Sequence, residues 1–174
     1  MSATQSGGEV TRRDPAWLCT IDGISDRLAE GATGADLGCG TGRWTVELAR
    51  AFRHSSFVGV DEDAARVAAA RALALRAGVH RRTRFEVGTA AELSGCGYDL
   101  VTVLDSRTVH RLTPEAACCL RTSLVVDGRL LAVTPIAAVP TGPERLAGLL
   151  HESGFRHVQV VARTSLDLVL EARP

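Results

Sequence analysis

The sequence predicts an α/β domain in which a mostly parallel β-sheet carries helices on both faces. From Thr33 onwards, short apolar runs alternate with helical segments of roughly 10–15 residues, a pattern typical of βαβ units. The last two apolar runs, 157–163 and 166–172, are joined by a connection too short for a crossover, which permits only an antiparallel hairpin. We therefore expect about seven strands, six of them parallel and the last antiparallel.

Each predicted strand is a short apolar run bounded by turn or helix signals. The run before Asp61 is apolar on both alternating faces, as expected for a strand buried between two layers of helices. A short helical turn is expected at 90–93, between the third and fourth strands. The predicted strands are 33–37, 55–60, 83–87, 98–104, 129–134, 157–163 and 166–172.

The predicted helices begin at capping residues. Asp14 precedes Pro15 at the start of the first helix, an arrangement preferred at helix N-termini. Thr113 and Pro114 repeat this arrangement later in the chain. Asp63 is placed to cap an alanine-rich helical segment. The predicted helices are 15–30, 43–53, 61–79, 113–126 and 143–155.

Length and composition indicate one globular domain. The chain has 174 residues, of which 45% are hydrophobic and 23% charged, as is ordinary for globular proteins. We expect residues 1–14 to form a disordered tail, and residues 15–174 to form a single domain that includes one N-terminal helix. The formal net charge is zero, which argues against a nucleic acid as partner. No apolar run approaches the ~18–20 residues of a membrane span, so no membrane association is expected.

Cysteine usage predicts a cytoplasmic protein without a metal site. The five cysteines are odd in number, and the sequence has neither a CxxC pair nor a Cys/His cluster at metal-ligand spacing. This usage is typical of a reducing compartment. All twenty basic residues are arginine, which we attribute to a GC-rich coding bias.

The stretch ADLGCGTGRW, 35–44, lies where an α/β sheet binds its ligand. A dinucleotide-binding turn needs its third glycine at position 43, which here is Arg43. Asp36 is out of place beside a pyrophosphate but can attract an ammonium group, while N–H groups at the helix start can take a carboxylate. Asp61, at the end of the second strand, is placed to accept hydrogen bonds from two ribose hydroxyls. An amino acid joined to a ribose describes S-adenosylmethionine.

The same segments resemble the motifs of class I S-adenosylmethionine-dependent methyltransferases. ADLGCGTGRW is similar to their first motif and FVGVDED to their second. FEVGTAAEL, YDLVTVLDSRTVHRL and LVVDGRLLAVTP resemble the segments at the third, fourth and fifth strands. The resemblance implies a Rossmann-like seven-stranded sheet and S-adenosylmethionine as cofactor. The cofactor contacts that it implies are Asp36, Gly38, Cys39, Gly40, Gly42, Asp61, Glu62, Thr89, Ala90, Ala91 and Leu104.

Thr89 departs from the family's pattern. The family usually has an aspartate at this position, which accepts a hydrogen bond from the adenine amine. A threonine offers only a hydroxyl, and loss of one hydrogen bond of this kind costs on the order of 1–3 kcal/mol. We therefore expect weaker cofactor binding rather than none.

The segment 105–112 is expected to face the methyl group. His110 is the candidate general base, since an unperturbed imidazole titrates near neutrality; its alternative role is to line the pocket. Asp105 is the second candidate, as a group near the sulfonium or the acceptor, with helix capping as its alternative. Arg107 either pairs with an anionic substrate or lies in solvent. The family's metal-dependent members carry an Asp-Asn pair where this chain has TPIA, which argues against a metal.

Two functions from different classes remain open. The first is an S-adenosylmethionine-dependent methyltransferase acting on a small molecule, such as a specialised metabolite. The second is an S-adenosylmethionine-binding module, or a partner subunit, that does not transfer methyl groups by itself. The short segment after the fifth strand suggests an open site, which a second copy in a homodimer would cover or which a carrier-bound or peptide substrate would fill.

Overall fold

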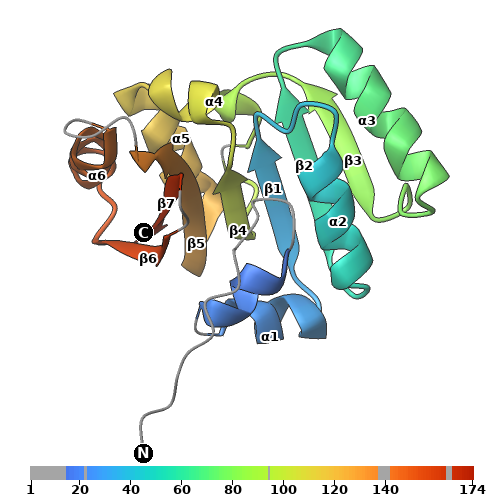
Figure 1. Ribbon diagram of the computed structural model, residues 1–174, viewed down its shortest axis with the longest axis horizontal. Helices are drawn as coiled ribbons and strands as arrows, with labels where there is room; N and C mark the ends of the chain where they lie inside the picture. The colour runs from blue at the N-terminus through green and yellow to red at the C-terminus, as the bar shows by residue number, and fades with distance from the viewer. Residues whose placement is uncertain (1–14, 22, 94, 137–141, 164–165) are drawn as a thin grey trace, which may run out of the picture.

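The computed structural model describes residues 15–174, apart from 22, 94, 137–141 and 164–165. The expected tail at 1–14, with the Asp14 cap, lies outside the described residues. A single seven-stranded sheet crosses the molecule in the order β3-β2-β1-β4-β5-β7-β6 (Figure 1). Its strands are β1 Thr33–Leu37, β2 Ser56–Asp61, β3 Thr83–Val87, β4 Tyr98–Val103, β5 Leu124–Pro135, β6 His157–Arg163 and β7 Asp167–Arg173.

The strand directions confirm the predicted topology. β1 pairs in parallel with β2 and β4, β2 with β3, and β4 with β5. β7 is antiparallel to both of its neighbours, β5 and β6. Six strands therefore run one way and the last runs the other. Because the order reverses between β2 and β4 on either side of β1, the carboxyl end of β1 is the sheet's switch point.

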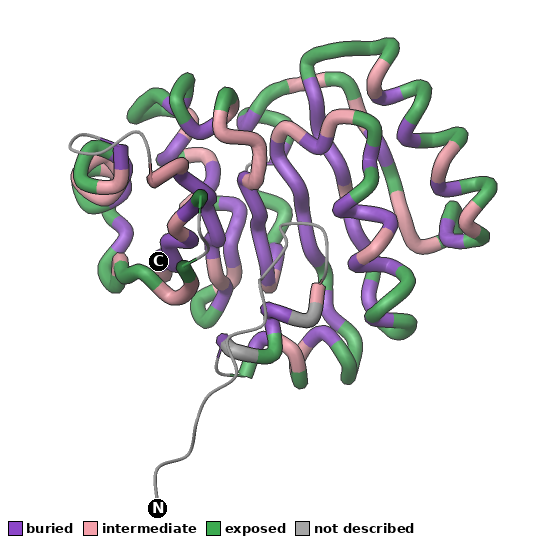
Figure 2. Tube along the Cα trace, viewed as in Figure 1, coloured by how far each residue is buried: buried purple, intermediate pink, exposed green. Residues whose placement is uncertain are grey.

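Helices cover both faces of the sheet, as predicted. The α-helices are α1 Ile24–Glu30, α2 Arg43–Ala51, α3 Ala64–Arg76, α4 Ser106–His110, α5 Pro114–Ser123 and α6 Gly142–Glu152, and the 3₁₀ helices are η1 Pro15–Thr20 and η2 Ala90–Leu93. One buried apolar cluster joins η1, α1, α2 and α3 to the sheet, and a second joins α5 and α6 to it. Figure 2 shows the central strands buried and the outer sides of the helices exposed, whereas the edge strand β6 has no buried residue. Among the described residues, no helix is long and apolar enough to cross a membrane.

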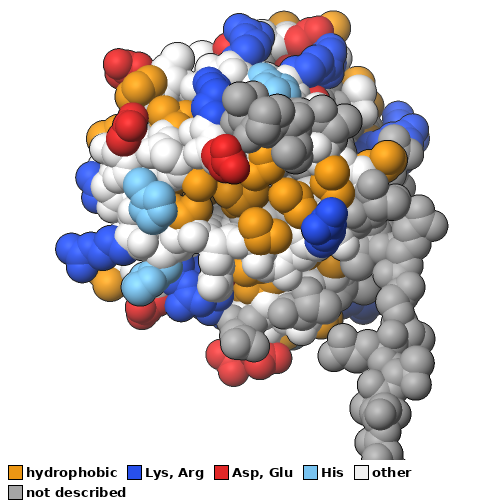
Figure 3. Space-filling view, turned by 60° about the vertical axis from the view of Figure 1, so that its left-hand side comes forward, with side chains coloured by type: hydrophobic (Ala, Val, Ile, Leu, Met, Phe, Trp, Pro, Cys, Tyr) orange, Lys and Arg blue, Asp and Glu red, His pale blue; other side chains and the backbone are white. Residues whose placement is uncertain are grey.

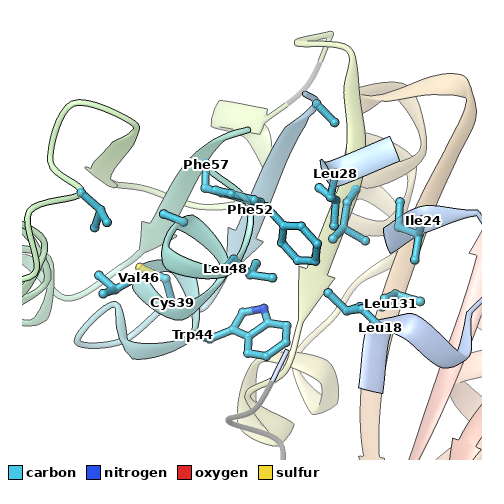
Figure 4. Packing of buried hydrophobic residues seen from close by; sticks show 14 of the residues in the cluster. Leu18, Ile24, Leu28, Cys39, Trp44, Val46, Leu48, Phe52, Phe57 and Leu131 are labelled. Carbon is cyan, nitrogen blue, oxygen red and sulfur yellow. The ribbon is translucent and has the colours of Figure 1, made fainter. Parts of the chain in front are cut away.

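The first core cluster anchors the N-terminal segment to the helix that follows the glycines. Trp17 of η1 stacks on Trp44 of α2, with ring centroids 5.7 Å apart and planes 16° from parallel. Figure 4 shows Trp44 and Leu48 facing Leu18 across the same space. Burying side chains of this size stabilises the fold by about 1.5–3 kcal/mol each. The N-terminal segment thereby helps to hold α2 against the sheet.

The single helix predicted over 15–30 is wrong. The chain forms η1 and then α1, and Gly23 lies between them with φ +76°, a left-handed conformation that glycine adopts without penalty. The sequence carried this signal, because a glycine inside a helical pattern often ends one helix before another begins.

Other boundaries also differ from prediction: α3 is shorter by three residues at each end, α6 ends three residues early, and the junction of α5 with β5 is displaced. Helix α5 ends at Ser123 rather than at 126, and β5 begins at Leu124 rather than at 129. The pairing of β5 with β4 is irregular at its start. Gly128 permits this irregularity, because a Cβ there would lie 2.8 Å from the carbonyl oxygen of Tyr98. The short helix α4 was not predicted as an element, although Asp105 had been considered as a helix cap.

Candidate cofactor and acceptor site

The glycine turn after β1 folds back on the end of β2. The N–H groups of Gly38 and Cys39 both donate to the Val60 carbonyl oxygen, at 2.8 and 3.1 Å. Gly38 and Gly40 have φ values of +74° and +56°, which side chains rarely adopt. A Cβ at Gly38 would lie 2.3 Å from Thr108 Oγ1, whereas a Cβ at Gly40 would meet nothing within 4 Å. The turn therefore packs on its α4 side and leaves open space at Gly40.

Asp36 lies beneath this turn, with only 3% of its surface exposed. Thr102 Oγ1 donates to Asp36 Oδ1 and Thr45 Oγ1 donates to Oδ2, each at 2.9 Å. Trp44 Nε1 donates in turn to Thr102 Oγ1 at 3.2 Å. Burial raises the pKa of Asp36 to about 7, against the effect of the two threonine hydroxyls. Asp36 is thus a buried carboxylate that titrates near neutrality.

Asp61 ends β2 beside the turn and is 8% exposed. Its Oδ2 accepts from the Gly40 N–H at 2.8 Å and its Oδ1 from the Asp63 N–H at 3.0 Å. Each carboxylate oxygen can accept more than one hydrogen bond, so Asp61 keeps capacity for a ligand's hydroxyl groups. The backbone has therefore fixed the orientation of a carboxylate at the switch point.

A cavity of about 650 Å³ opens at the carboxyl end of the sheet, between the start of α3 and α4. In Figure 1 this is the end at which β1 points and α4 lies. Seven predicted site residues line it: Gly38, Asp61, Glu62, Thr89, Ala90, Asp105 and His110. The remaining lining residues are Leu37, Asp63, Arg66, Gly88, Arg107, Thr108, Arg111, Leu112 and Ala116. The predicted residues that are not in this lining are Asp36, Cys39, Gly40, Gly42, Ala91 and Leu104.

Cys39 and Leu104, two of the predicted residues outside the lining, pack their side chains against the core. Cys39 is buried, and burial raises the pKa of its thiol far above the ordinary value. Its sulfur lies 2.9 Å from where a Cβ on Gly59 would stand, so the glycine in β2 makes room for it. Leu104 packs against the first core cluster. The Cys39 side chain is therefore turned away from the cavity, and Leu104 is only partly buried.

Thr89 is held by a capping arrangement with Glu92. The Glu92 carboxylate accepts from the Thr89 N–H at 2.6 Å and from the Thr89 hydroxyl at 3.0 Å. The same hydroxyl oxygen accepts from the Ala91 N–H at 3.3 Å. A Cβ at Gly88 would collide with Glu92, so the glycine is needed for this arrangement. The sequence signal, Thr-x-x-Glu ahead of a helical turn, was present but was not used.

Helix α4 forms one wall of the cavity. Asp105 Oδ2 accepts from the Thr108 N–H at 3.3 Å and from Thr108 Oγ1 at 3.1 Å, which makes Asp105 the N-cap of this helix. At the other end, Arg145 Nη2 donates to the carbonyl oxygens of His110 and Leu112 at 3.3 and 3.4 Å. Both ends of α4 are therefore fixed by side chains, one of them from α6.

Arg66 and Arg111 are lining residues that sequence reasoning missed. Arg111 Nη2 contacts Glu62 Oε2 at 3.3 Å, which joins α4 to the segment after β2. Arg66 pairs within its own wall, with Asp63 at 3.4 Å. Arg66 lies outside the motif segments, and Arg111 lies within the fourth-strand segment without having been singled out, because only the position of α4 brings it opposite Glu62. Among the described residues, no group of three or more His, Cys, Asp or Glu could hold a metal ion.

Comparison with known proteins identifies the family. Residues 35–124 match the model of a methyltransferase domain family. Trans-aconitate 2-methyltransferase of Deinococcus radiodurans is 44% identical over 66 residues, which are 38% of this chain and 23% of that protein. An O-methyltransferase family protein from Burkholderia thailandensis superposes with a TM-score of 0.72 at 16% identity, over 91% of this chain and 55% of that one. The [4+2]-cyclase SpnF superposes with a TM-score of 0.69 at 18% identity, over 86% and 80%.

The chain belongs to the methyltransferase domain family. Its Rossmann-like fold is that of S-adenosylmethionine-dependent methyltransferases, and S-adenosylmethionine is the methyl donor that this membership implies. The chain spans about a quarter of the curated relative and about half of the Burkholderia protein.

The residues on the cavity wall fit this cofactor. The molecule contains a ribose and an amino acid end. The site offers a fixed carboxylate at Asp61 on the cavity wall and, outside the lining, a glycine turn with open space at Gly40. The N–H groups of Gly38, Cys39 and Gly40 already have partners, so the N–H groups at the start of α2 are the ones that would hold the carboxylate. When bound, S-adenosylmethionine supplies a methyl group on a positively charged sulfur. The protein's own residues have to hold the cofactor, exclude water and place an acceptor.

Proposed function

We propose that this protein transfers a methyl group from S-adenosylmethionine to a small-molecule acceptor. The observation that carries the proposal is the cavity at the switch point. Gly38 of the glycine turn, Asp61 and residues of α4 all line this one cavity. Support also comes from the curated relative, which is named for a small-molecule acceptor, trans-aconitate.

Placement of the acceptor against the methyl group would supply most of the rate, because methyl transfer is an in-line displacement. His110 lines the cavity and is our candidate base for an acceptor that must lose a proton. Asp105 acts chiefly as the cap of α4 in this proposal, since both of its oxygens already have partners at the helix start. We propose that Asp36 acts on the cofactor's ammonium from beneath the turn, through its charge.

The first test is binding, followed by turnover. S-adenosylhomocysteine at a hundred times its dissociation constant should add about 2.7 kcal/mol of stability. For a chain of this size, that raises the unfolding midpoint by roughly 5–11 °C. Formation of S-adenosylhomocysteine from S-adenosylmethionine, with trans-aconitate and other small acids, alcohols and amines as acceptors, then tests methyl transfer. NAD serves as the control ligand and should cause no shift.

A cofactor-binding module without methyl transfer is the second candidate. SpnF is named as a cyclase although it shares this fold, so the fold alone does not fix the chemistry. Binding of S-adenosylhomocysteine without turnover of any acceptor would favour this second function. We also propose that a second copy of the chain or a bulky acceptor covers the open site. Light scattering with and without cofactor would show whether the protein is a dimer.

A further inference from the structure

The α4 wall of the cavity carries more basic than acidic side chains. Arg107, His110 and Arg111 line it beside one carboxylate, Asp105, and Arg66 lies on the α3 side. In Figure 3, charged side chains of both signs and a histidine gather at the top, the end at which the strands of Figure 1 stop, whereas the middle of that face is apolar. The question is what these basic groups hold.

Four carboxylates line the same cavity; Glu62 pairs with Arg111, and the other three accept hydrogen bonds from backbone N–H groups. Asp61 accepts from two N–H groups, and Asp63 accepts from the N–H groups of Ala65 and Arg66 at the start of α3. Asp105 accepts from the start of α4. Helix-capping carboxylates have much of their charge offset by the helix dipole and by these N–H groups. They therefore neutralise the neighbouring guanidinium groups only in part.

Arg107 is held weakly, by a contact to a carboxylate that also accepts hydrogen bonds from the start of α4. Its Nε contacts Asp105 Oδ1 at 3.4 Å, a long contact to one oxygen, and 70% of its side chain is exposed. An exposed ion pair of this kind contributes little to stability. A guanidinium group has five N–H donors in a planar fork that matches a carboxylate through two parallel hydrogen bonds. A ligand carboxylate in the cavity can thus replace the single contact of Arg107 with Asp105 by two parallel hydrogen bonds to the Arg107 guanidinium.

Resting on the proposed function, we propose that the methyl acceptor is an organic acid whose carboxylate is held by Arg107. Arg111, tied to Glu62 at 3.3 Å, adds positive charge on the same wall. Where the methylated group is itself a carboxylate, its oxygen attacks the methyl carbon. The carbon–sulfur bond breaks, its electron pair stays on sulfur, and the products are a methyl ester and S-adenosylhomocysteine. No proton is released, so this reaction needs no general base.

The test compares acids with their uncharged analogues on wild type and two matched variants. Succinate, tricarballylate and benzoate, each with its primary amide, are titrated by calorimetry into the protein with and without S-adenosylhomocysteine, and are assayed as acceptors. Arg107→Gln removes the proposed contact. Arg50→Gln is the control, because Arg50 makes a similar single contact, to Glu47 at 3.4 Å, on α2 away from the cavity.

We expect at least one acid to bind while its amide does not. Arg107→Gln should lower the affinity for that acid, or raise its KM, by about tenfold. The change in kcat should be smaller, and the affinity for S-adenosylhomocysteine should be unchanged. Arg107→Lys should restore part of the binding, and salt should weaken it. Equal binding of acids and amides, no acid binding at millimolar concentration, or equal behaviour of the two glutamine variants would overturn the inference. Failure of S-adenosylhomocysteine to bind would contradict the proposed function instead.

Discussion

Asp36 shows how one buried carboxylate can make cofactor binding depend on pH. Its pKa of about 7 results mainly from burial, and the charge of Asp61 adds to the rise. A cationic ligand group nearby favours the ionised form, so binding of an ammonium-bearing ligand must release a proton. We expect the affinity for S-adenosylhomocysteine to fall by up to about tenfold per pH unit below about pH 6. Calorimetry across the pH range measures this fall directly.

Asp36→Asn separates binding from stability at this position. The folded pKa lies above the unfolded one, so the proton on Asp36 stabilises the fold at low pH, and this contribution is lost as pH rises through about 7. The asparagine variant should therefore bind S-adenosylhomocysteine more weakly, with a flatter pH profile. Without ligand it should gain stability relative to wild type above about pH 8, by up to about 4 kcal/mol. A pH profile unchanged from wild type would contradict this account of Asp36.

Single residues also show what sequence alone could predict at the site. Asp61 and His110, both predicted as site residues, line the cavity, because the ends of parallel strands and the loops that follow them converge at one edge of a sheet. The capped state of Thr89 was readable from its spacing to Glu92. The contact between Arg111 and Glu62 was not readable, since it depends on where α4 lies in space.

At the scale of elements, the Glu62–Arg111 ion pair connects the two sides of the cavity. Among the described residues, the other ion pairs of lining residues stay within one wall, as Asp63 with Arg66 does. Both partners are largely exposed, so the pair should contribute about 0–1 kcal/mol to stability. We expect Arg111→Gln to leave the unfolding midpoint of the free protein nearly unchanged but to speed dissociation of S-adenosylhomocysteine about threefold to tenfold.

A charge swap tests this expectation. The double variant Glu62→Arg with Arg111→Glu should recover slower dissociation in stopped-flow measurements, whereas each single charge reversal should not. Equal dissociation rates in wild type and Arg111→Gln would show that the pair does not retain the ligand.

The elements themselves were predictable to different degrees. The bounds of β1, β3 and β6 were predicted to the residue and those of β2 and β4 to within one residue, since short runs rich in apolar residues and bounded by turn or helix signals are readable from sequence. The break at Gly23 and the irregular start of β5 depend on backbone conformations that tertiary contacts select. The five residues of α4 are too few to show a helical period, and the helix exists because Asp105 and Arg145 hold its ends.

At the scale of the whole molecule, Glu171 fastens together the three C-terminal strands. It lies on β7 with 1% of its surface exposed and forms an ion pair with Arg129 of β5. Gln159 Nε2 of β6 donates to its Oε2 at 2.9 Å, and Arg173 Nε lies 3.2 Å from Oε1. Burial opposes ionisation of Glu171, yet these partners hold its pKa below the ordinary value. None of the four residues lines the cavity, so this network should govern stability without governing ligand binding.

Two variants distinguish a buried charge pair from simple packing. Glu171→Ala removes the buried carboxylate that pairs with Arg129, which should cost about 3–5 kcal/mol and lower the unfolding midpoint by roughly 6–20 °C. Replacing both partners, Glu171→Leu with Arg129→Met, should cost far less, because the carboxylate and the guanidinium are then removed together. Since the folded pKa of Glu171 is depressed, its contribution is present above about pH 4.5 and is lost as the pH falls through the folded pKa. The unfolding midpoints of the wild type and Glu171→Ala should therefore differ at neutral pH and converge in acid. A double variant that is as unstable as Glu171→Ala would rule out the charge pair as the cause.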